Sequence, residues 1–289
     1  MRRPIVVGVD GSEQALAAAH YAGALAKRLQ ASLRLIYVFE SVFYGYGPLA
    51  IAGSYGIADD QLREAVKATL GEIAREITSA YPEVEVEPQV REGGAAATLI
   101  AESQDAEVTV IGSRGLGGFA GLMLGSVSSQ VATHAEGVVV VVRQGGVPDG
   151  HVLVGIDGSP QAAAALEYAV VEALTRDVAL VVALAYWEEP WGFGKEPETD
   201  PAVTAAHEAA AFVEQAVKPW RERHPELRVE ARTLHSMNAE HSLVEESEHA
   251  GLTVVGSRGR GGFTGLLLGS VSRTLVHHAH GPVAVVHSK

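Results

Sequence analysis

The sequence predicts an α/β protein made of two tandem domains, each a doubly wound, five-stranded parallel sheet. Short apolar runs of strand length alternate with longer stretches of helical spacing, and this alternation indicates a parallel sheet with helices on both faces. The whole pattern occurs twice in 289 residues. A chain of this length is expected to form about two domains of roughly 150 residues each.

Five apolar runs in the first half have the length of buried strands and cover residues 5–9, 33–38, 84–91, 108–111 and 138–142. Helical spacing is found between them at residues 13–30, 60–81, 95–104 and 126–134. Ser12 is a favourable N-cap for the first helix, and Asp59 or Asp60 for the second. The segment 40–60, rich in Gly, Tyr, Pro and Ala, is predicted to be a loop.

The pattern restarts after a linker rich in Gly and Pro. Residues 152–159 repeat residues 5–12, and both copies end in Asp-Gly-Ser. In the second repeat a strand is expected to end near Ala185, and further strands are expected at 228–234, 252–255 and 283–286. Helices are expected to end near Arg223 and His249. We therefore predict one domain at 1–144, a linker at 145–149 and a second domain at 150–289.

Bulk composition limits the classes of partner. The net charge of −13 disfavours duplex nucleic acid and anionic membrane surfaces, which need clustered Lys and Arg. The absence of cysteine removes disulfide and thiolate chemistry. The first residues contain too short an apolar run for a signal peptide, and no apolar stretch has membrane-spanning length. A cytoplasmic protein is the expectation.

A block of seventeen residues, Gly112 to Ser128, recurs at Gly256 to Ser272 with 14 identities. Its glycines allow backbone N–H groups to approach a ligand, and consecutive N–H groups in such turns bind anions. Gly125 and Ser126 open a helix whose N-terminus carries free N–H groups and partial positive charge. The hydroxyls of Ser126 and Ser128 could add hydrogen bonds to phosphate oxygens. The block therefore predicts a phosphate site in each repeat.

Two acidic residues belong to the same reasoning. Asp10 ends the first strand and Gly112 the fourth, so both would face one crevice if these strands are neighbours. A carboxylate repels phosphates, so Asp10 and Asp157 are expected to accept hydrogen bonds from ribose hydroxyls or a base amino group, or to hold Mg²⁺.

Simpler interpretations compete with this one. The glycine-rich segment could be only a turn, Ser126 only an N-cap, and Arg114 and Arg258 only solvated surface charges. For Ser12 and Ser159 the N-cap interpretation is preferred. The block is neither a Walker A loop, since Gly-Lys-Ser/Thr is absent, nor a dinucleotide fingerprint, since its spacing differs and it follows the fourth strand.

The pattern resembles the universal stress protein family, in its tandem-domain, ATP-binding form. The residues that carry the resemblance are Gly-x-x-Gly, nine residues, then Gly-Ser, at Gly112–Ser126 and again at Gly256–Ser270. The resemblance covers essentially the whole chain. It implies the strand order 3-2-1-4-5 of adenine nucleotide alpha hydrolase-like folds, with ATP held between strands one and four.

The resemblance also implies the site residues. In the first domain they are Gly8, Asp10, Val38, Gly112, Ser113, Arg114, Gly115, Leu116, Gly117, Gly118, Gly125, Ser126, Val127 and Ser128. In the second domain they are Gly155, Asp157, Leu184 or Ala185, Gly256, Ser257, Arg258, Gly259, Arg260, Gly261, Gly262, Gly269, Ser270, Val271 and Ser272. The second repeat has Leu234-His-Ser-Met-Asn238 where the first has Gly93-Gly94, which gives a reason to expect unequal affinity.

Other features carry weaker expectations. His277, His278 and His280 do not share a helix face, so no metal site is expected there. Tyr44, Tyr46, Tyr55, Trp187 and Trp191 lie in the two variable loops, as a lid or partner surface or as base-stacking groups. The strand 138–142 would be an exposed apolar edge, which pairing of the two fifth strands or a homodimer would cover.

Three functions fit these observations. The first is an ATP-binding regulator of the stress response with one site per domain, no catalytic residues and an unknown regulatory partner. The second is a slow, Mg²⁺-dependent ATPase or ATP-using transferase that uses Asp10 and Asp157. The third is a scaffold with a vestigial pocket. The sequence does not choose among ATP, AMP and a cyclic nucleotide.

Overall fold

The computed structural model describes residues 2–39, 55–116, 124–143, 145, 147–187, 201–261 and 267–287; the side chains of 55–60 and 201 are outside this description. The chain divides into two compact units between Arg143 and Gln144. Among the described residues, no helix is long and apolar enough to cross a membrane.

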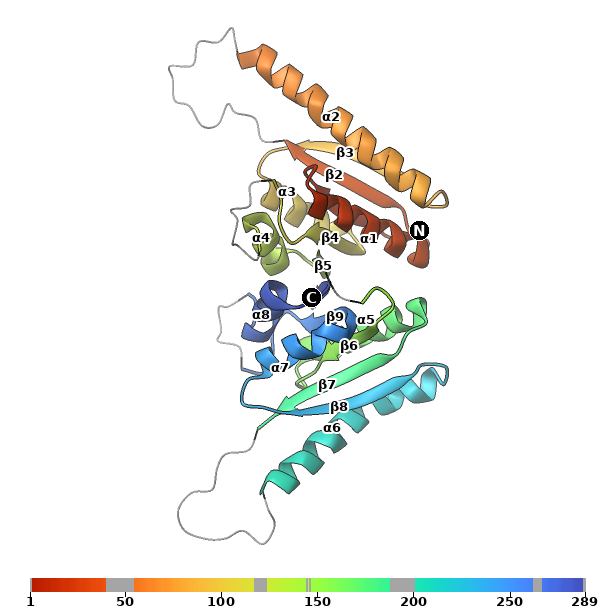
Figure 1. Ribbon diagram of the computed structural model, residues 1–289, viewed down its shortest axis with the longest axis vertical. Helices are drawn as coiled ribbons and strands as arrows, with labels where there is room; N and C mark the ends of the chain where they lie inside the picture. The colour runs from red at the N-terminus through yellow and green to blue at the C-terminus, as the bar shows by residue number, and fades with distance from the viewer. Residues whose placement is uncertain are drawn as a thin grey trace. The chain divides into compact units, whose positions relative to one another are not determined.

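Unit 1 contains a parallel five-stranded sheet with the order β3-β2-β1-β4-β5 (Figure 1). Its strands are β1 (Ile5–Val9), β2 (Leu33–Phe39), β3 (Val86–Glu92), β4 (Val108–Gly112) and β5 (Val138–Val142). Its helices are α1 (Glu13–Leu29), α2 (Tyr55–Ala80), α3 (Ala95–Glu102) and α4 (Ser126–His134). Helices α1 and α2 pack together on one face, and α3 and α4 pack together on the other. The predicted fold class and strand order are confirmed.

Unit 2 repeats this architecture, with the order β8-β7-β6-β9-β10. Its strands are β6 (His151–Gly155), β7 (Leu180–Tyr186), β8 (Val229–His235), β9 (Ala250–Gly256) and β10 (Val283–Val286). Its helices are α5 (Pro160–Arg176), α6 (Pro201–Arg223), α7 (Ala239–Glu246) and α8 (Ser270–His278). Each unit therefore brings the ends of its first and fourth strands side by side.

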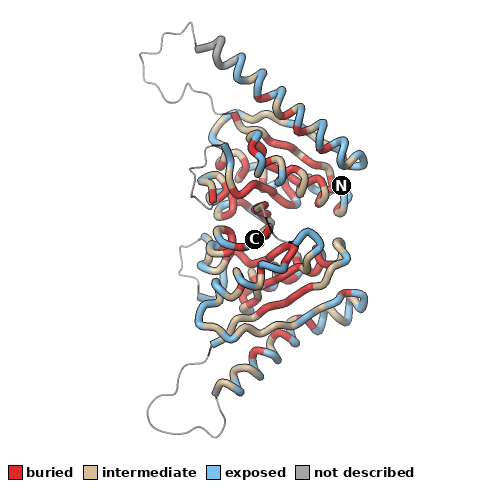
Figure 2. Tube along the Cα trace, in the orientation of Figure 1, coloured by how far each residue is buried: buried red, intermediate tan, exposed pale blue. Residues whose placement is uncertain are grey.

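The central strands form the core of each unit because helices cover both of their faces. Ile5, Val6 and Val7 of β1 are fully buried, as are Val152, Leu153 and Val154 of β6. Figure 2 shows this burial as continuous red along the central strands, whereas the outer side of α2 is largely exposed. Near-continuous apolar runs are expected for parallel strands buried on both faces.

Three predicted helix boundaries need correction. Helix α2 begins at Tyr55, so Asp59 and Asp60 lie inside its first turns and are not its N-cap. The third predicted helix of each unit ends earlier, and a 3₁₀ turn follows it at Ser103–Asp105 and Ser247–His249.

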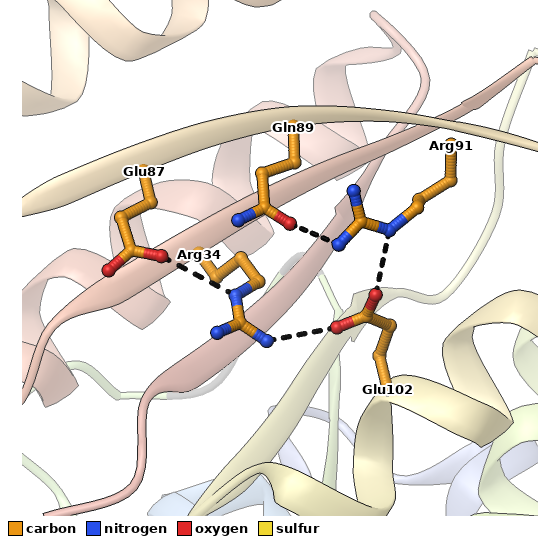
Figure 3. A network of polar contacts seen from close by, with 5 residues as sticks. All are labelled: Arg34, Glu87, Gln89, Arg91 and Glu102. Atoms are coloured by element: carbon orange, nitrogen blue, oxygen red, sulfur yellow. Dashed lines mark hydrogen bonds and ion pairs between the residues drawn. The ribbon is translucent and has the colours of Figure 1, made fainter.

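A polar network fixes α3 of unit 1 to the sheet (Figure 3). Glu102, at the end of α3, accepts hydrogen bonds from Arg34 Nη1 on β2 at 3.0 Å and from Arg91 Nε on β3 at 2.9 Å. Arg34 also reaches Glu87, and Arg91 reaches Gln89. In unit 2 a single arginine, Arg232, bonds the corresponding Glu246 as well as Glu230. Both arrangements hold the helix that lies beside the crevice described next.

Candidate functional site

A cavity of about 420 Å³ lies at the carboxyl ends of β1 and β4 in unit 1. These strands are hydrogen-bonded neighbours, with Val7 opposite Val110, so Asp10 and the loop after Gly112 face each other. The described wall consists of Gly8, Val9, Asp10, Ala15, Ile36, Val38, Ala95, Leu99, Ile111, Gly112, Arg114, Gly115, Leu124, Gly125, Ser126, Val127 and Ser128. Small-molecule pockets typically measure about 300–1,000 Å³, so the cavity has ligand-binding size.

The Asp10 carboxylate joins the two loops. Its Oδ1 accepts the backbone N–H of Ser12 at 3.0 Å, and its Oδ2 accepts the backbone N–H of Leu116 at 2.9 Å. Each carboxylate oxygen can accept a further hydrogen bond. Asp10 therefore fixes the glycine-rich loop in place while keeping lone pairs for a ligand.

Glycine is required where the loop passes closest to Asp10. A Cβ on Gly115 would collide with Asp10 Oδ2, and a Cβ on Gly112 would meet the backbone of Gln14 at 2.9 Å. Gly8 is equally restricted, because its Cβ would approach Leu99 Cδ1 to 2.6 Å. These glycines permit close packing of β1, β4 and α3 around the cavity.

The N-terminus of α4 is open to the cavity. Its N-cap, Gly125, has no side chain, and the N–H groups of Ser126, Val127 and Ser128 have no acceptor among the described residues. Helix α1 starts nearby but is capped, because the Ser12 hydroxyl accepts the N–H of Ala15 at 3.1 Å. The structure thus leaves only one of these two helix starts free to bind an anion.

Unit 2 repeats the arrangement in a cavity of about 470 Å³. Asp157 accepts the N–H of Ser159 at 2.9 Å and that of Arg260 at 2.8 Å. A Cβ on Gly259 would collide with Asp157 Oδ2. Ser159 caps α5, whereas Gly269 leaves the start of α8 uncapped by any side chain.

Positive charge gathers beside both cavities. In unit 1 burial lowers the pKa of Arg143, which follows β5, and the nearby Arg114 charge lowers it further. Tyr37 donates to the backbone carbonyl of Asp10 at 3.3 Å. Burial raises the pKa of this tyrosine, with a second contribution from the Asp10 charge. In unit 2 the described cavity wall contains Arg258, Arg260 and Arg273.

Most of the predicted site residues that the structure describes line the cavities. In unit 1 these are Gly8, Asp10, Val38, Gly112, Arg114, Gly115, Gly125, Ser126, Val127 and Ser128. In unit 2 these are Gly155, Asp157, Ala185, Gly256, Arg258, Gly259, Arg260, Gly261, Gly269, Ser270, Val271 and Ser272. Leu184 is not on the wall. Gly117, Gly118 and Gly262 lie outside the described residues.

Several predicted residues have structural roles instead. Ser113 lies off the wall, donates its N–H to Val142 and accepts that of Gly125; Ser257 is bonded in the same way. Leu116 contributes its backbone N–H, while its side chain is 71% exposed. The Ser128 hydroxyl donates to the Gly112 carbonyl at 2.7 Å and Ser272 to Gly256 at 2.6 Å, so these protons are not available to phosphate.

The apolar part of each wall was missing from the sequence prediction. It consists of Val9, Ala15, Ile36, Ala95, Leu99, Ile111 and Leu124 in unit 1, and Ile156, Ala162, Ala239, Leu243, Val255 and Leu268 in unit 2, where Arg273 was also missed. A signal existed, because Ala95, Leu99 and Leu124 have identical counterparts at Ala239, Leu243 and Leu268. Comparing the apolar positions of the two repeats, inside and outside the glycine-rich block, would have identified these positions.

Trp187, His277, His278 and His280 are not part of the described wall of either cavity. Trp187 is 45% exposed and stacks on His235 with ring centroids 5.2 Å apart. Tyr44, Tyr46 and Trp191, and the side chain of Tyr55, fall outside the described residues. Within the described ranges, no three His, Asp or Glu side chains form a group suited to a metal ion.

Comparison with known proteins agrees with this architecture. The universal stress protein family matches residues 1–143 and 150–287. A universal stress protein of Mycolicibacterium smegmatis is 36% identical, over 98% of this chain and 96% of the relative. One from Mycobacterium tuberculosis is 33% identical, over 97% and 96%. The crystal structure of a universal stress protein from Archaeoglobus fulgidus covers 99% of this chain and 96% of that chain, with a TM-score of 0.70 at 22% identity, and thus shares the fold. The chain therefore belongs to the universal stress protein family and carries two domains of that family in tandem.

Proposed function

We propose that each unit binds one adenine nucleotide, ATP, in the cavity between its first and fourth strands, and that occupancy regulates the stress response. The observation that carries this proposal is the uncapped start of α4 and α8 beside a glycine-rich loop, at the wall of a cavity of ligand-binding size. Three consecutive N–H groups with no described acceptor form a ready anion site.

The remainder of each wall fits the other parts of a nucleotide. In unit 1 the side chains of Ile36, Val38 and Leu99 offer an apolar surface for a base. The second lone pairs of Asp10 suit ribose hydroxyls, which are hydrogen-bond donors. Arg114 supplies a cation at the phosphate end. The cavity wall thus offers a binding group for the base, the ribose and the phosphates of a nucleotide.

We favour regulation over catalysis because of how the carboxylate is used. The described wall of each cavity contains one carboxylate, and both of its oxygens already accept backbone N–H groups. The remaining lone pairs can accept hydrogen bonds from ribose hydroxyls, whereas protonation of this carboxylate as a general base would weaken the hydrogen bonds that anchor the glycine-rich loop. We therefore propose that the protein is a cytoplasmic switch controlled by nucleotide occupancy, which acts on a regulatory partner. We also propose that the apolar fifth strands are covered, either in a homodimer or by pairing with each other. A slow, Mg²⁺-dependent ATPase or transferase is the alternative.

Nucleotide extraction and calorimetry test the proposal. Heat-treated, purified full-length protein is expected to release adenine nucleotide, and ATP titration of stripped protein is expected to show two sites per chain. Absence of both signals would contradict the proposal and favour a scaffold. Mg²⁺-dependent phosphate release that is lost in Asp10→Ala with Asp157→Ala would favour the alternative.

A further inference from the structure

The two cavities differ in charge at two corresponding positions. Arg260 of unit 2 stands where unit 1 has Leu116, and Arg273 stands where unit 1 has Ser129. Both arginines belong to the described wall of the unit 2 cavity. That wall therefore carries three guanidinium groups and one carboxylate, whereas the described wall in unit 1 carries one of each, Arg114 and Asp10.

Arg260 is anchored at the wall of its cavity. Its backbone N–H is bonded to Asp157, which fixes the residue at the glycine-rich loop. Its side chain lies against Gly158, in the turn after β6, with the guanidinium carbon 5.5 Å from the centre of the Phe212 ring. A cation over an aromatic face is favourable and needs no counter-ion. Arg260 is thus anchored to Asp157 through its backbone, and the residue belongs to the described wall of the cavity.

Arg273 lies in an electrostatically unfavourable place. It is in the first turn of α8, where the helix dipole is positive and a cation is disfavoured. The side chain is exposed and forms no ion pair within the described part of the chain. An anion bound at the start of α8 would attract Arg273 and so offset its repulsion by the helix dipole. In unit 1 the uncharged Ser129 occupies the position.

Arg143 does not restore the balance in unit 1. Its charge is close enough to that of Arg114 for each to repel the other, but the residue follows β5 and is not part of the described wall. Unit 2 has His287 at the corresponding position after β10. The excess of cations directly on the wall therefore belongs to unit 2.

From these positions we propose that the unit 2 cavity selects nucleotides with an extended, highly charged phosphate chain, such as a triphosphate. The unit 1 cavity discriminates little between a triphosphate and a monophosphate. Because each charge-assisted hydrogen bond to phosphate strengthens binding, added phosphate groups gain more where three guanidinium groups surround them. The inference rests on the proposed nucleotide binding and assigns different preferences to the two sites.

The test uses the full-length chain with one cavity closed at a time. Gly125→Val is expected to obstruct unit 1 and Gly269→Val to obstruct unit 2, because each adds a branched side chain to the cavity wall at the helix start. The fold should be retained, since a Cβ at either position makes only ordinary contacts of 3.5 Å or more. Calorimetry then gives the ratio of ATP to AMP affinity for the open cavity. We expect this ratio to be at least about tenfold larger for unit 2, and ATP binding there to weaken more steeply with salt.

Exchange of the two side chains then assigns the cause. Arg260→Leu with Arg273→Ser should lower the ratio in unit 2 to that of unit 1, and Leu116→Arg with Ser129→Arg should raise it in unit 1. Arg223→Leu with Arg228→Ser is the matched control. It removes the same charge from residues off the cavity wall, at the end of α6 and before β8, and should leave the ratio unchanged.

The outcomes separate this inference from the proposed function. Equal ratios in the two cavities, with ATP bound in both, would overturn the inference and leave nucleotide binding intact. A ratio that falls equally in the control would also overturn it, because long-range charge would then be the cause. Failure of ATP and AMP to bind in either cavity would overturn the proposed function itself.

Discussion

Asp10 Oδ2 lies 2.9 Å from the backbone nitrogen of Leu116, and this hydrogen bond joins the end of β1 to the loop after β4. Asp157 and Arg260 repeat the relationship at 2.8 Å in unit 2. The sequence predicted that this aspartate would contact only a ligand, but it also anchors the loop that would hold phosphate. Loss of its charge should consequently affect binding through the shape of the site.

Replacement of both aspartates by asparagine tests this role. In Asp10→Asn with Asp157→Asn one carboxylate oxygen becomes an NH₂ group, which cannot accept a backbone N–H. We expect a loss of about 1 kcal/mol of unfolding free energy, since the hydrogen bonds are partly exposed, and a clearly weaker affinity for ATP. Denaturant unfolding and calorimetry measure the two effects. Unchanged affinity would show that the anchored loop is not needed for binding.

Alanine at the close-approach glycines should weaken ATP binding without unfolding the protein. In Gly115→Ala with Gly259→Ala the new methyl groups occupy the space of Asp10 Oδ2 and Asp157 Oδ2, so both carboxylates must move away from their loops. We expect native circular dichroism and at least about a tenfold loss of affinity, which corresponds to roughly 1.4 kcal/mol.

Gly71→Ala is the control for this pair. Gly71 lies inside α2, and a Cβ there meets nothing within 4 Å. Alanine at a helix-interior position of this kind should stabilise the protein by about 0.5–1 kcal/mol and leave ATP affinity unchanged. If both glycine substitutions changed affinity to the same extent, the effect would not come from the aspartates.

The cap serines should contribute to stability only. Ser12 and Ser159 accept N–H groups of α1 and α5 at 3.1 Å, and neither is on a cavity wall. Ser12→Ala and Ser159→Ala should each lower the unfolding free energy by about 1 kcal/mol. Thermal unfolding would measure this loss, with ATP affinity as the second readout. A tenfold drop in affinity at constant stability would contradict the N-cap assignment.

The sequence predicted the repeat, the element types and most of the glycine-rich walls because these depend on local patterns. Gly112 and Gly256 end a strand, and Gly125 and Gly269 precede a helix, and this arrangement is visible in the residues themselves. Strand order was less accessible, since the pairing of β1 with β4 joins residues about a hundred positions apart. The resemblance to a family supplied that order.

Other features could not be inferred from local patterns. The hydroxyl of Ser128 looked suited to phosphate, but folding places it under the Gly112 carbonyl, which takes its proton. Leu99 reaches the cavity because α3 packs across β2 beside Gly8, a contact that depends on tertiary structure. In unit 1 Arg34 and Arg91 bond Glu102, whereas in unit 2 Arg232 bonds the equivalent Glu246. This difference likewise depends on which strands pair.

His151 should make stability depend on pH. Burial lowers the pKa of this histidine, and the nearby Arg232 charge adds to the effect, which Glu230 and Glu246 oppose. Its Nε2 atom is buried without a hydrogen-bond partner in the described part of the chain. In the unfolded chain the pKa of histidine is about 6.5. As the pH falls below that value, the unfolded chain binds a proton that the folded chain does not yet accept.

The unfolding free energy should therefore be highest above about pH 6.5 and decline as the pH falls through that value. In His151→Gln, which cannot titrate, the decline between pH 7 and pH 5.5 should be smaller than in the unmodified protein, as measured by urea unfolding at each pH. His241→Gln replaces a histidine whose side chain is 71% exposed and controls for the loss of one imidazole. An identical decline in all three proteins would mean that protonation of His151 costs the folded state nothing, in conflict with its burial beside Arg232.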